Sequence, residues 1–174
     1  VPGHLRTLVV VPALLTSHDD IEELIDRLEV HYLANSGGEL YFALLTDWTD
    51  STSETAENDD ELLLTALDGI ARLNAEHGAD RFLLLHRGRR WNEAQGRWMG
   101  WERKRGKLHE LNRPLRGESD TTFMVVGGRI PPEVRFVLTL DSDTRLPRDA
   151  ARRMVGKIAH PGSQSNADSL RRQV

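Results

Sequence analysis

The sequence contains no cysteine, and this absence excludes several kinds of chemistry. Disulfide bonds, thiolate zinc sites and cysteine nucleophiles all need that residue. The chain also lacks an apolar run near the ~20 residues that a membrane-spanning helix requires, since its longest run, 8–15, contains Pro12. Its first residues show neither the basic nor the apolar segment of a secretory signal. Without an initiator methionine, the chain is expected to be a piece of a larger protein.

The charged residues show no overall excess of basic side chains, but they are unevenly distributed. The formal net charge is −4, which gives no reason to expect nucleic-acid binding. Residues 47–61 carry seven acids and no lysine or arginine, whereas residues 86–107 carry eight basic residues against two acids. Such segregation is typical of a face that holds an anion, although two solvated loops would give the same pattern.

Apolar periodicity predicts alternating strands and helices. The run 5–15 is apolar without alternation, as in a strand buried on both faces. Ser17 is a suitable helix N-cap, and Gly78 is placed to end a second helix. The predicted strands are 5–15, 40–46, 81–86 and 134–140, with 121–126 as a short edge strand; the predicted helices are 17–33, 57–77, 102–115 and 147–158.

This order predicts an α/β fold, with a mostly parallel, Rossmann-like sheet covered by helices on both faces. Ligands on such sheets bind at the carboxyl ends of the strands. The ends of the predicted strands are residues 12–17, 47–51, 86–90 and 141–144. The domain is expected to span residues 1–161, with residues 162–174 as a linker-like tail.

The strongest local motif is Asp141-Ser142-Asp143, directly after an apolar strand. Alternate residues of an extended chain point the same way, so both carboxylates can face one cation. Mg²⁺ and Mn²⁺ prefer oxygen ligands and commonly take one or two carboxylates plus substrate phosphates. By itself the pair could equally consist of solvated acids or cap the following helix.

Two further segments are candidates for ligand contacts. The basic segment 103–107 could neutralise a diphosphate, or it could be a solvated helix end. Asp47 could accept a hydrogen bond from a nucleobase or ribose, or it could be a turn residue. Trp91, Trp98 and Trp101 could form a stacking platform, but we expect most of them to pack onto the domain.

Several common sites are not indicated. The seven histidines show no close pairing, so none is assigned to a metal. Serine and histidine form no nucleophile elbow, and no Gly-x-Gly-x-x-Gly follows the first strand, so a dinucleotide site is not predicted.

Taken together, the segments TLVVVP (7–12), WMGWERKRGKL (98–108) and LDSDTRLP (140–147) resemble the GT-A-type glycosyltransferase domain of cyclic β-1,2-glucan synthases, large bacterial inner-membrane proteins. The resemblance runs from about residue 6 to residue 161. More distantly, the chain is similar to processive family-two glycosyltransferases. These contain a Val-Pro strand end, a strand-two aspartate, a Gly-Lys-x-x-x-Leu-Asn segment (here 106–112) and an Asp-x-Asp in the same order.

The resemblance implies a role for each matching residue. Pro12, Ala13 and Leu14 would flank the nucleotide, Asp47 would contact uracil, and Lys107 would approach the diphosphate. Asp141 would lie near the ribose and phosphates, and Asp141 and Asp143 would hold Mg²⁺ or Mn²⁺.

The resemblance also implies the reaction, in which an inverting enzyme uses UDP-glucose to build a cyclic β-1,2-glucan at the cytoplasmic face of the inner membrane. The glucan acceptor and the catalytic base would belong to an acceptor half beyond these residues. We therefore expect this chain alone to bind nucleotide weakly and not to transfer glucose.

Two alternatives come from other classes of protein. A phosphohydrolase of the haloacid-dehalogenase type also uses a strand-end Asp-x-Asp, although normally on an early strand. A nonenzymatic domain could use the basic, tryptophan-rich segment to hold RNA or a protein partner, with binding that falls steeply as salt is added.

Overall fold

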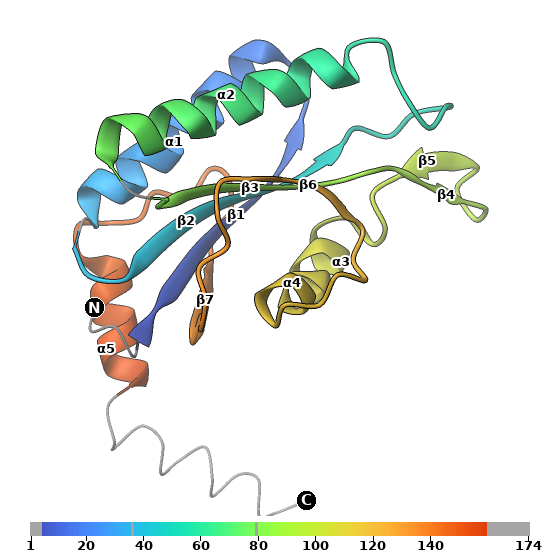
Figure 1. Cartoon of the computed structure of the whole chain (residues 1–174). Helices are drawn as coiled ribbons and strands as arrows, with labels where there is room; N and C mark the ends of the chain where they lie inside the picture. Colours follow the sequence, from blue (N-terminus) through green and yellow to red (C-terminus); the bar gives the residue numbers. More distant parts are fainter. Residues whose placement is uncertain (1–4, 36, 79, 160–174) are drawn as a thin grey trace, which may run out of the picture.

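A five-stranded, mostly parallel sheet forms the centre of the computed structural model, which describes residues 5–35, 37–78 and 80–159 (Figure 1). The strands are β1 (Thr7–Leu15), β2 (Leu40–Trp48), β3 (Phe82–Arg87), β6 (Phe123–Gly127) and β7 (Phe136–Thr139). Their order is β6-β3-β2-β1-β7, and only β6 runs antiparallel to its neighbour. The predicted α/β class and the predicted edge strand are therefore confirmed.

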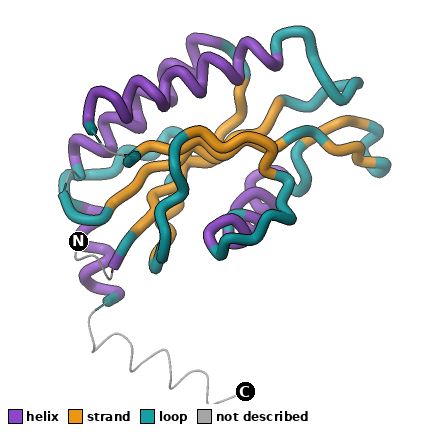
Figure 2. Tube along the Cα trace, in the orientation of Figure 1, coloured by secondary structure: helices purple, strands orange, loops and turns teal. Residues whose placement is uncertain are grey.

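Helices cover both faces of the sheet, as predicted. The long helices α1 (His18–Ala34) and α2 (Asp59–His77) lie along one face, and α3 (Arg103–Glu110) and α4 (Asn112–Leu115) lie against the other (Figure 2). The short helix α5 (Ala150–Ile158) follows β7 and inserts the side chain of Ala151 into the core beneath α1 and α2.

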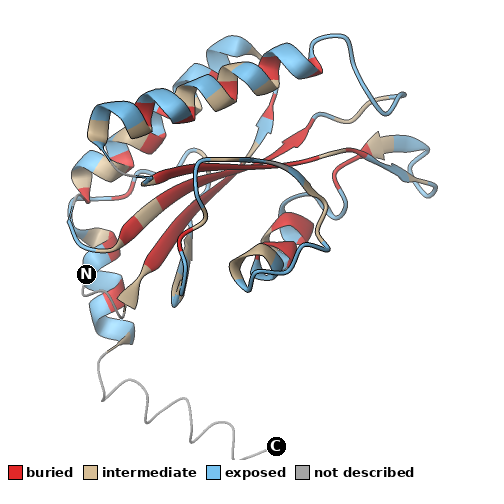
Figure 3. Cartoon of the chain, viewed as in Figure 1, coloured by how far each residue is buried: buried red, intermediate tan, exposed pale blue. Residues whose placement is uncertain are grey.

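The central strands are buried on both faces because helices lie above and below them (Figure 3). Alternate residues of a strand point to opposite faces. Val9 and Phe42 accordingly belong to the core beneath α1 and α2, whereas Leu8 and Leu45 belong to the core beneath α3 and α4. This double burial explains the unbroken apolar runs in the sequence.

The predicted helix ends are confirmed at α1 and α2. The Ser17 hydroxyl accepts a hydrogen bond from the backbone N–H of Asp20, which satisfies one free donor of the first turn. Gly78 ends α2 with a φ of 64°, in the region that glycine adopts without steric cost.

Several predicted boundaries need correction. Strand β2 continues to Trp48, so Asp47 is a strand residue rather than a turn residue. The helix predicted over 102–115 is divided into α3 and α4, because Pro114 has no N–H to donate to the carbonyl of Glu110. The last helix begins at Ala150 rather than at Pro147. The fourth parallel strand begins at Phe136 rather than at 134. The predicted tail 162–174 lies outside the described residues.

The tryptophan-rich segment is a hairpin, which the sequence reading missed. Strands β4 (Arg90–Asn92) and β5 (Arg97–Met99) pair antiparallel, with Trp91 opposite Trp98. The two indole rings contact each other edge to face, 6.0 Å apart, rather than packing onto the sheet. Trp91 and Trp101 remain about half exposed, so the expectation that most of these tryptophans are packed onto the domain was wrong.

Candidate functional site

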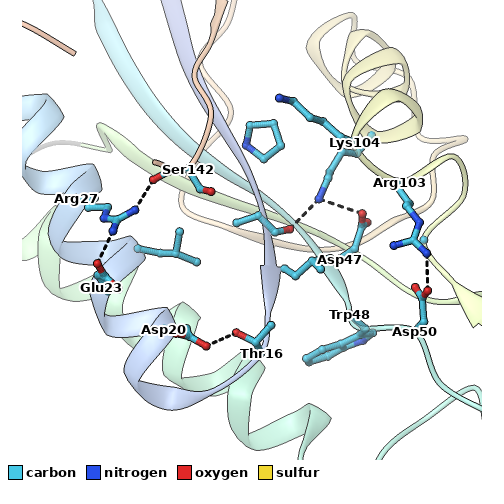
Figure 4. A pocket seen from close by; sticks show the side chains of 16 residues that line it. Thr16, Asp20, Glu23, Arg27, Asp47, Trp48, Asp50, Arg103, Lys104 and Ser142 are labelled. Carbon is cyan, nitrogen blue, oxygen red and sulfur yellow. Dashed lines mark hydrogen bonds and ion pairs between the residues drawn. The ribbon is translucent and has the colours of Figure 1, made fainter. Parts of the chain in front are cut away.

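A pocket of about 460 Å³ opens at the carboxyl edge of the parallel strands (Figure 4). It lies beside β1, where the strand order reverses between β2 on one side and β7 on the other. This is the position at which open α/β sheets bind ligands. Five of the predicted site residues line it together: Pro12, Ala13, Leu14, Asp47 and Lys107.

Asp47 and Lys107 form a buried ion pair at this pocket. The Lys107 ammonium lies 3.0 Å from Oδ2 of Asp47 and donates a hydrogen bond of 2.7 Å to the carbonyl of Ala13. Burial is the largest influence on the pKa of Lys107 and lowers it, and the neighbouring Asp47 carboxylate opposes that shift. The pair thus connects α3, β2 and the end of β1 at one point.

Arg87 is the other cation on Asp47, and the sequence reading did not single it out. It lies beside Asp47 in the register of β2 and β3, and its side chain is 1% exposed. Its Nε lies 2.7 Å from Oδ1 of Asp47, and its Nη2 lies 3.1 Å from Oδ2. Both carboxylate oxygens are therefore engaged by cations.

Arg87 also fixes the segment that leads into α3. Its Nη2 donates to the carbonyls of Trp101 and Arg103, at 3.1 and 3.0 Å. Its Nη1 lies 3.4 Å from a carboxylate oxygen of Glu110. The signal available in the sequence was a cation two residues after the apolar run of β3, within a predicted strand-end region.

Two glycines make room for this arrangement. A Cβ added to Gly100 would lie 2.7 Å from the carboxylate carbon of Asp47, and one added to Gly106 would lie 2.0 Å from the carbonyl oxygen of Trp101. A larger residue at Gly100 would push the segment before α3 away from Asp47, and one at Gly106 would push α3 away from that segment. Both glycines fall within the segments that carry the family resemblance.

Polar side chains of α1 and of the loop after β2 form the walls of the pocket. Asp20 and Glu23 line the α1 side, while Arg103 lies on the opposite side and donates a hydrogen bond of 2.6 Å to Asp50 (Figure 4). Trp48 contributes an apolar surface beside them. The acidic segment 47–61 and the basic segment 86–107 therefore meet at the pocket, where their side chains form ion pairs.

The Asp-Ser-Asp motif forms a turn at the rim of the pocket. The N–H of Thr144 donates to the carbonyl of Asp141 over 2.9 Å, and only Ser142 of the motif lines the pocket itself. Both aspartates are exposed. Asp141 forms an ion pair with Lys104, and the carbonyl of Ser142 accepts a 2.6 Å hydrogen bond from Arg27.

The two carboxylates of the Asp-Ser-Asp turn are suitable ligands for a hard divalent cation. Asp141 and Asp143 offer exposed carboxylate oxygens at the edge of a pocket that also contains basic groups. Mg²⁺ and Mn²⁺ are typically held by one or two carboxylates together with water and substrate phosphates. The two exposed carboxylates of the turn are ligands of that kind.

Within the described residues, a group of three potential metal ligands occurs elsewhere. Glu29, Glu76 and His77 lie within 4.8 Å of one another between α1 and α2. Because α2 ends there and leads into the start of β3, this group lies at the amino edge of the sheet, away from the pocket. His77 also contacts the rings of Tyr32 and Phe82, as expected for a histidine that joins two helices.

His86 is buried beneath the pocket residues. Its Nδ1 lies 2.8 Å from the hydroxyl of Thr46, its ring contacts Trp48 edge to face at 4.3 Å, and its Nε2 has no hydrogen-bond partner among the described residues. Burial lowers the pKa of His86 to about 4, so the ring is neutral at pH 7.

The fold and the pocket together define an α/β domain with a polar pocket at its topological switch point. No family model matches the chain. Over 164 residues, which are 92% of the chain, it is 57% identical to the cyclic β-(1,2)-glucan synthase NdvB of Rhizobium meliloti (strain 1021). The chain spans 6% of the length of that protein.

This similarity confirms the resemblance that the motifs indicated: the chain is similar to a segment of a cyclic glucan synthase. In the part of the chain that the structure describes, no helix has both the length and the apolar character needed to cross a bilayer.

Proposed function

We propose that this chain is the donor-binding part of an inverting, GT-A-type glycosyltransferase that uses UDP-glucose to extend a β-1,2-linked glucan. The parent protein would act at the cytoplasmic face of the bacterial inner membrane, and a glucan acceptor and a catalytic base would come from other parts of it. The relative is a much longer protein whose name is that of a glucan synthase, and this supports the proposal.

The observation that carries the proposal is the convergence of the predicted residues on one edge of the sheet. Residues 12–14, Asp47 and Lys107 line a single pocket, and the Asp-Ser-Asp turn lies at its rim. These segments are up to about 130 residues apart in the chain. The alternatives explain this arrangement less well: a phosphohydrolase of the haloacid-dehalogenase type normally carries its Asp-x-Asp on an early strand, whereas here the motif follows β7, and a basic interaction surface would not need a pocket.

In the proposed complex, residues 12–14 would lie beside the nucleotide and Asp47 near its uracil. A contact between Asp47 and uracil would have to compete with Arg87 and Lys107 for the carboxylate oxygens. We therefore propose that Asp47 also acts indirectly, by holding Lys107 at the pocket where it can approach the diphosphate.

Asp141 and Asp143 would hold Mg²⁺ or Mn²⁺, which would supply positive charge against the departing diphosphate. Arg103 and Lys104 line the same pocket and would add to that charge. None of the residues named here is proposed as the base that deprotonates the acceptor hydroxyl.

Calorimetric titration tests the proposal directly. UDP and UDP-glucose are titrated into the chain with and without Mn²⁺, and again into Asp143→Ala. We expect binding that depends on Mn²⁺ in the wild-type chain and is lost in the variant, because Asp143 is an exposed carboxylate without an ion-pair partner among the described residues.

Asp68→Ala is the matched control, since Asp68 is exposed on α2 and does not line the pocket. It should bind UDP as the wild type does. If the wild-type chain binds UDP equally well without a divalent ion, or if Asp143→Ala keeps metal-dependent binding, the proposed site is wrong.

A further inference from the structure

We propose that Lys104 takes the place of the divalent cation at Asp141 when no metal is bound, and that metal binding releases Lys104 to the diphosphate of the donor. This inference rests on the proposed function and concerns a residue to which the family resemblance gives no individual role. It makes Lys104 a positioning and coupling residue between the metal and the nucleotide.

Lys104 has two charged neighbours at the pocket, Asp141 and Lys107. It belongs to the first turn of α3, it lines the pocket, and its ammonium forms an ion pair with Asp141. It is also close enough to Lys107 to contribute to the lowering of the pKa of that residue. Lys104 therefore lies between the turn that would hold the metal and the cation that would approach the phosphates.

The two aspartates of the turn differ in their partners. Asp141 is neutralised by Lys104, whereas Asp143 has no ion-pair partner in the described part of the chain. A divalent cation bound by both carboxylates would lie close to the Lys104 ammonium at Asp141. Like charges repel at short range, so the cation and the Lys104 ammonium compete for the same oxygens.

The turn itself is held independently of Lys104. Arg27 on α1 donates a 2.6 Å hydrogen bond to the carbonyl of Ser142, and Glu23 one turn earlier on α1 pairs with the same guanidinium (Figure 4). Breaking the Lys104–Asp141 pair would leave this contact in place. Lys104 can therefore exchange partners without moving the turn.

Released from Asp141, Lys104 remains a residue of the pocket wall with an exposed, flexible side chain. A phosphate group in the pocket is then its natural counter-ion. Lys104 would therefore have opposite effects on the two ligands, because it competes with the metal and attracts the nucleotide. Removing the lysine charge should strengthen metal binding and weaken nucleotide binding.

The experiment measures two affinities of Lys104→Gln and the wild type at low ionic strength, where an exposed ion pair is least screened. Binding of Mn²⁺ alone is followed by the electron paramagnetic resonance signal of the free ion, and binding of UDP at saturating Mn²⁺ by calorimetry. We expect Mn²⁺ to bind roughly 1.5- to 5-fold more tightly to the variant, the range that corresponds to loss of an exposed ion pair. UDP should bind at least about threefold more weakly, because a charge-assisted hydrogen bond to phosphate is lost.

Arg105→Gln is the control for the loss of one positive charge. Arg105 is next to Lys104 in α3, but its side chain is 89% exposed, pairs with Glu102 and does not line the pocket. It should change both affinities much less than Lys104→Gln does, because its charge is paired with Glu102 and acts on the pocket only through water of high dielectric constant.

The two proposals fail differently. If the wild type binds Mn²⁺ and UDP but Lys104→Gln binds Mn²⁺ no more tightly, or loses both affinities together, the competitive role of Lys104 is overturned and the donor site stands. If the wild type binds neither Mn²⁺ nor UDP, the proposed function is wrong, and the role of Lys104 is wrong with it.

Discussion

Replacement of Arg87 by methionine removes the guanidinium that joins β2, β3 and the segment before α3. The wild-type side chain is 1% exposed and donates to Asp47 and to the carbonyls of Trp101 and Arg103. Methionine can fill the space of the aliphatic part of arginine, so the main change is the loss of the guanidinium with its charge and hydrogen-bond donors. The prediction concerns the free energy of unfolding.

The magnitude follows from which partners are left without a donor. Removing one member of a buried ion pair costs about 3–5 kcal/mol. Without Arg87, Asp47 would still pair with Lys107, and Glu110 would still accept its hydrogen bonds from Thr122. Neither carboxylate would be left without a partner. We therefore expect the lower end of that range, about 3 kcal/mol. Since domains are commonly stable by about 5–15 kcal/mol, the variant should still fold.

Urea unfolding followed by circular dichroism gives the free energy directly. Arg87→Lys should recover only part of the loss, because one ammonium group cannot reproduce the planar set of five donors. Arg105→Met serves as the control at an exposed arginine and should stay within about 0.5 kcal/mol of the wild type. A loss below about 1 kcal/mol for Arg87→Met would refute the claim that this residue holds α3 against the sheet.

Two further predictions concern packing and pH. Gly100→Ala should lower the free energy of unfolding by about 1–3 kcal/mol, because the added Cβ would overlap the Asp47 carboxylate. Gly156→Ala is the control in the same urea titrations. It should be neutral or slightly stabilising, because there is open space around Gly156. Burial lowers the pKa of His86 to about 4, below the value near 6.5 of an unfolded histidine. The unfolded chain therefore binds the proton first, so the contribution of His86 is complete above pH 6.5 and is lost as the pH falls towards 4, by up to roughly 3 kcal/mol. Urea titrations between pH 7.5 and 5 should show a smaller loss for His86→Gln than for the wild type, and identical pH dependence would contradict the burial argument.

The amino-acid sequence determined most of the local structure. Uninterrupted apolar runs identified strands buried on both faces, and Ser17 and Gly78 identified helix ends, because capping depends on residues close together in the chain. The alternation of strands and helices then implied a parallel sheet. That topology placed residues 12–14, Asp47 and the turn after β7 at one edge, before any contact between them was known.

Other features depended on neighbours that periodicity does not reveal. The division between α3 and α4 follows from one missing N–H, and the β4–β5 hairpin is a short local pairing within a segment whose composition suggested a loop. The exposure of Trp91 and Trp101 could not be predicted either, because an indole ring packs equally well against a core or against another indole.

Only the tertiary structure decided how the charged residues of the pocket are paired. The sequence indicated that Asp47, Lys107 and Asp141 belong to one region, but not that Arg87 shares Asp47 with Lys107 or that Lys104 reaches Asp141. These partners are 37 to 60 residues apart in the chain. Which of several nearby cations meets a given carboxylate depends on the register of β2 against β3 and on how closely α3 approaches the sheet. Both are set by packing over the whole domain, and no local pattern encodes them.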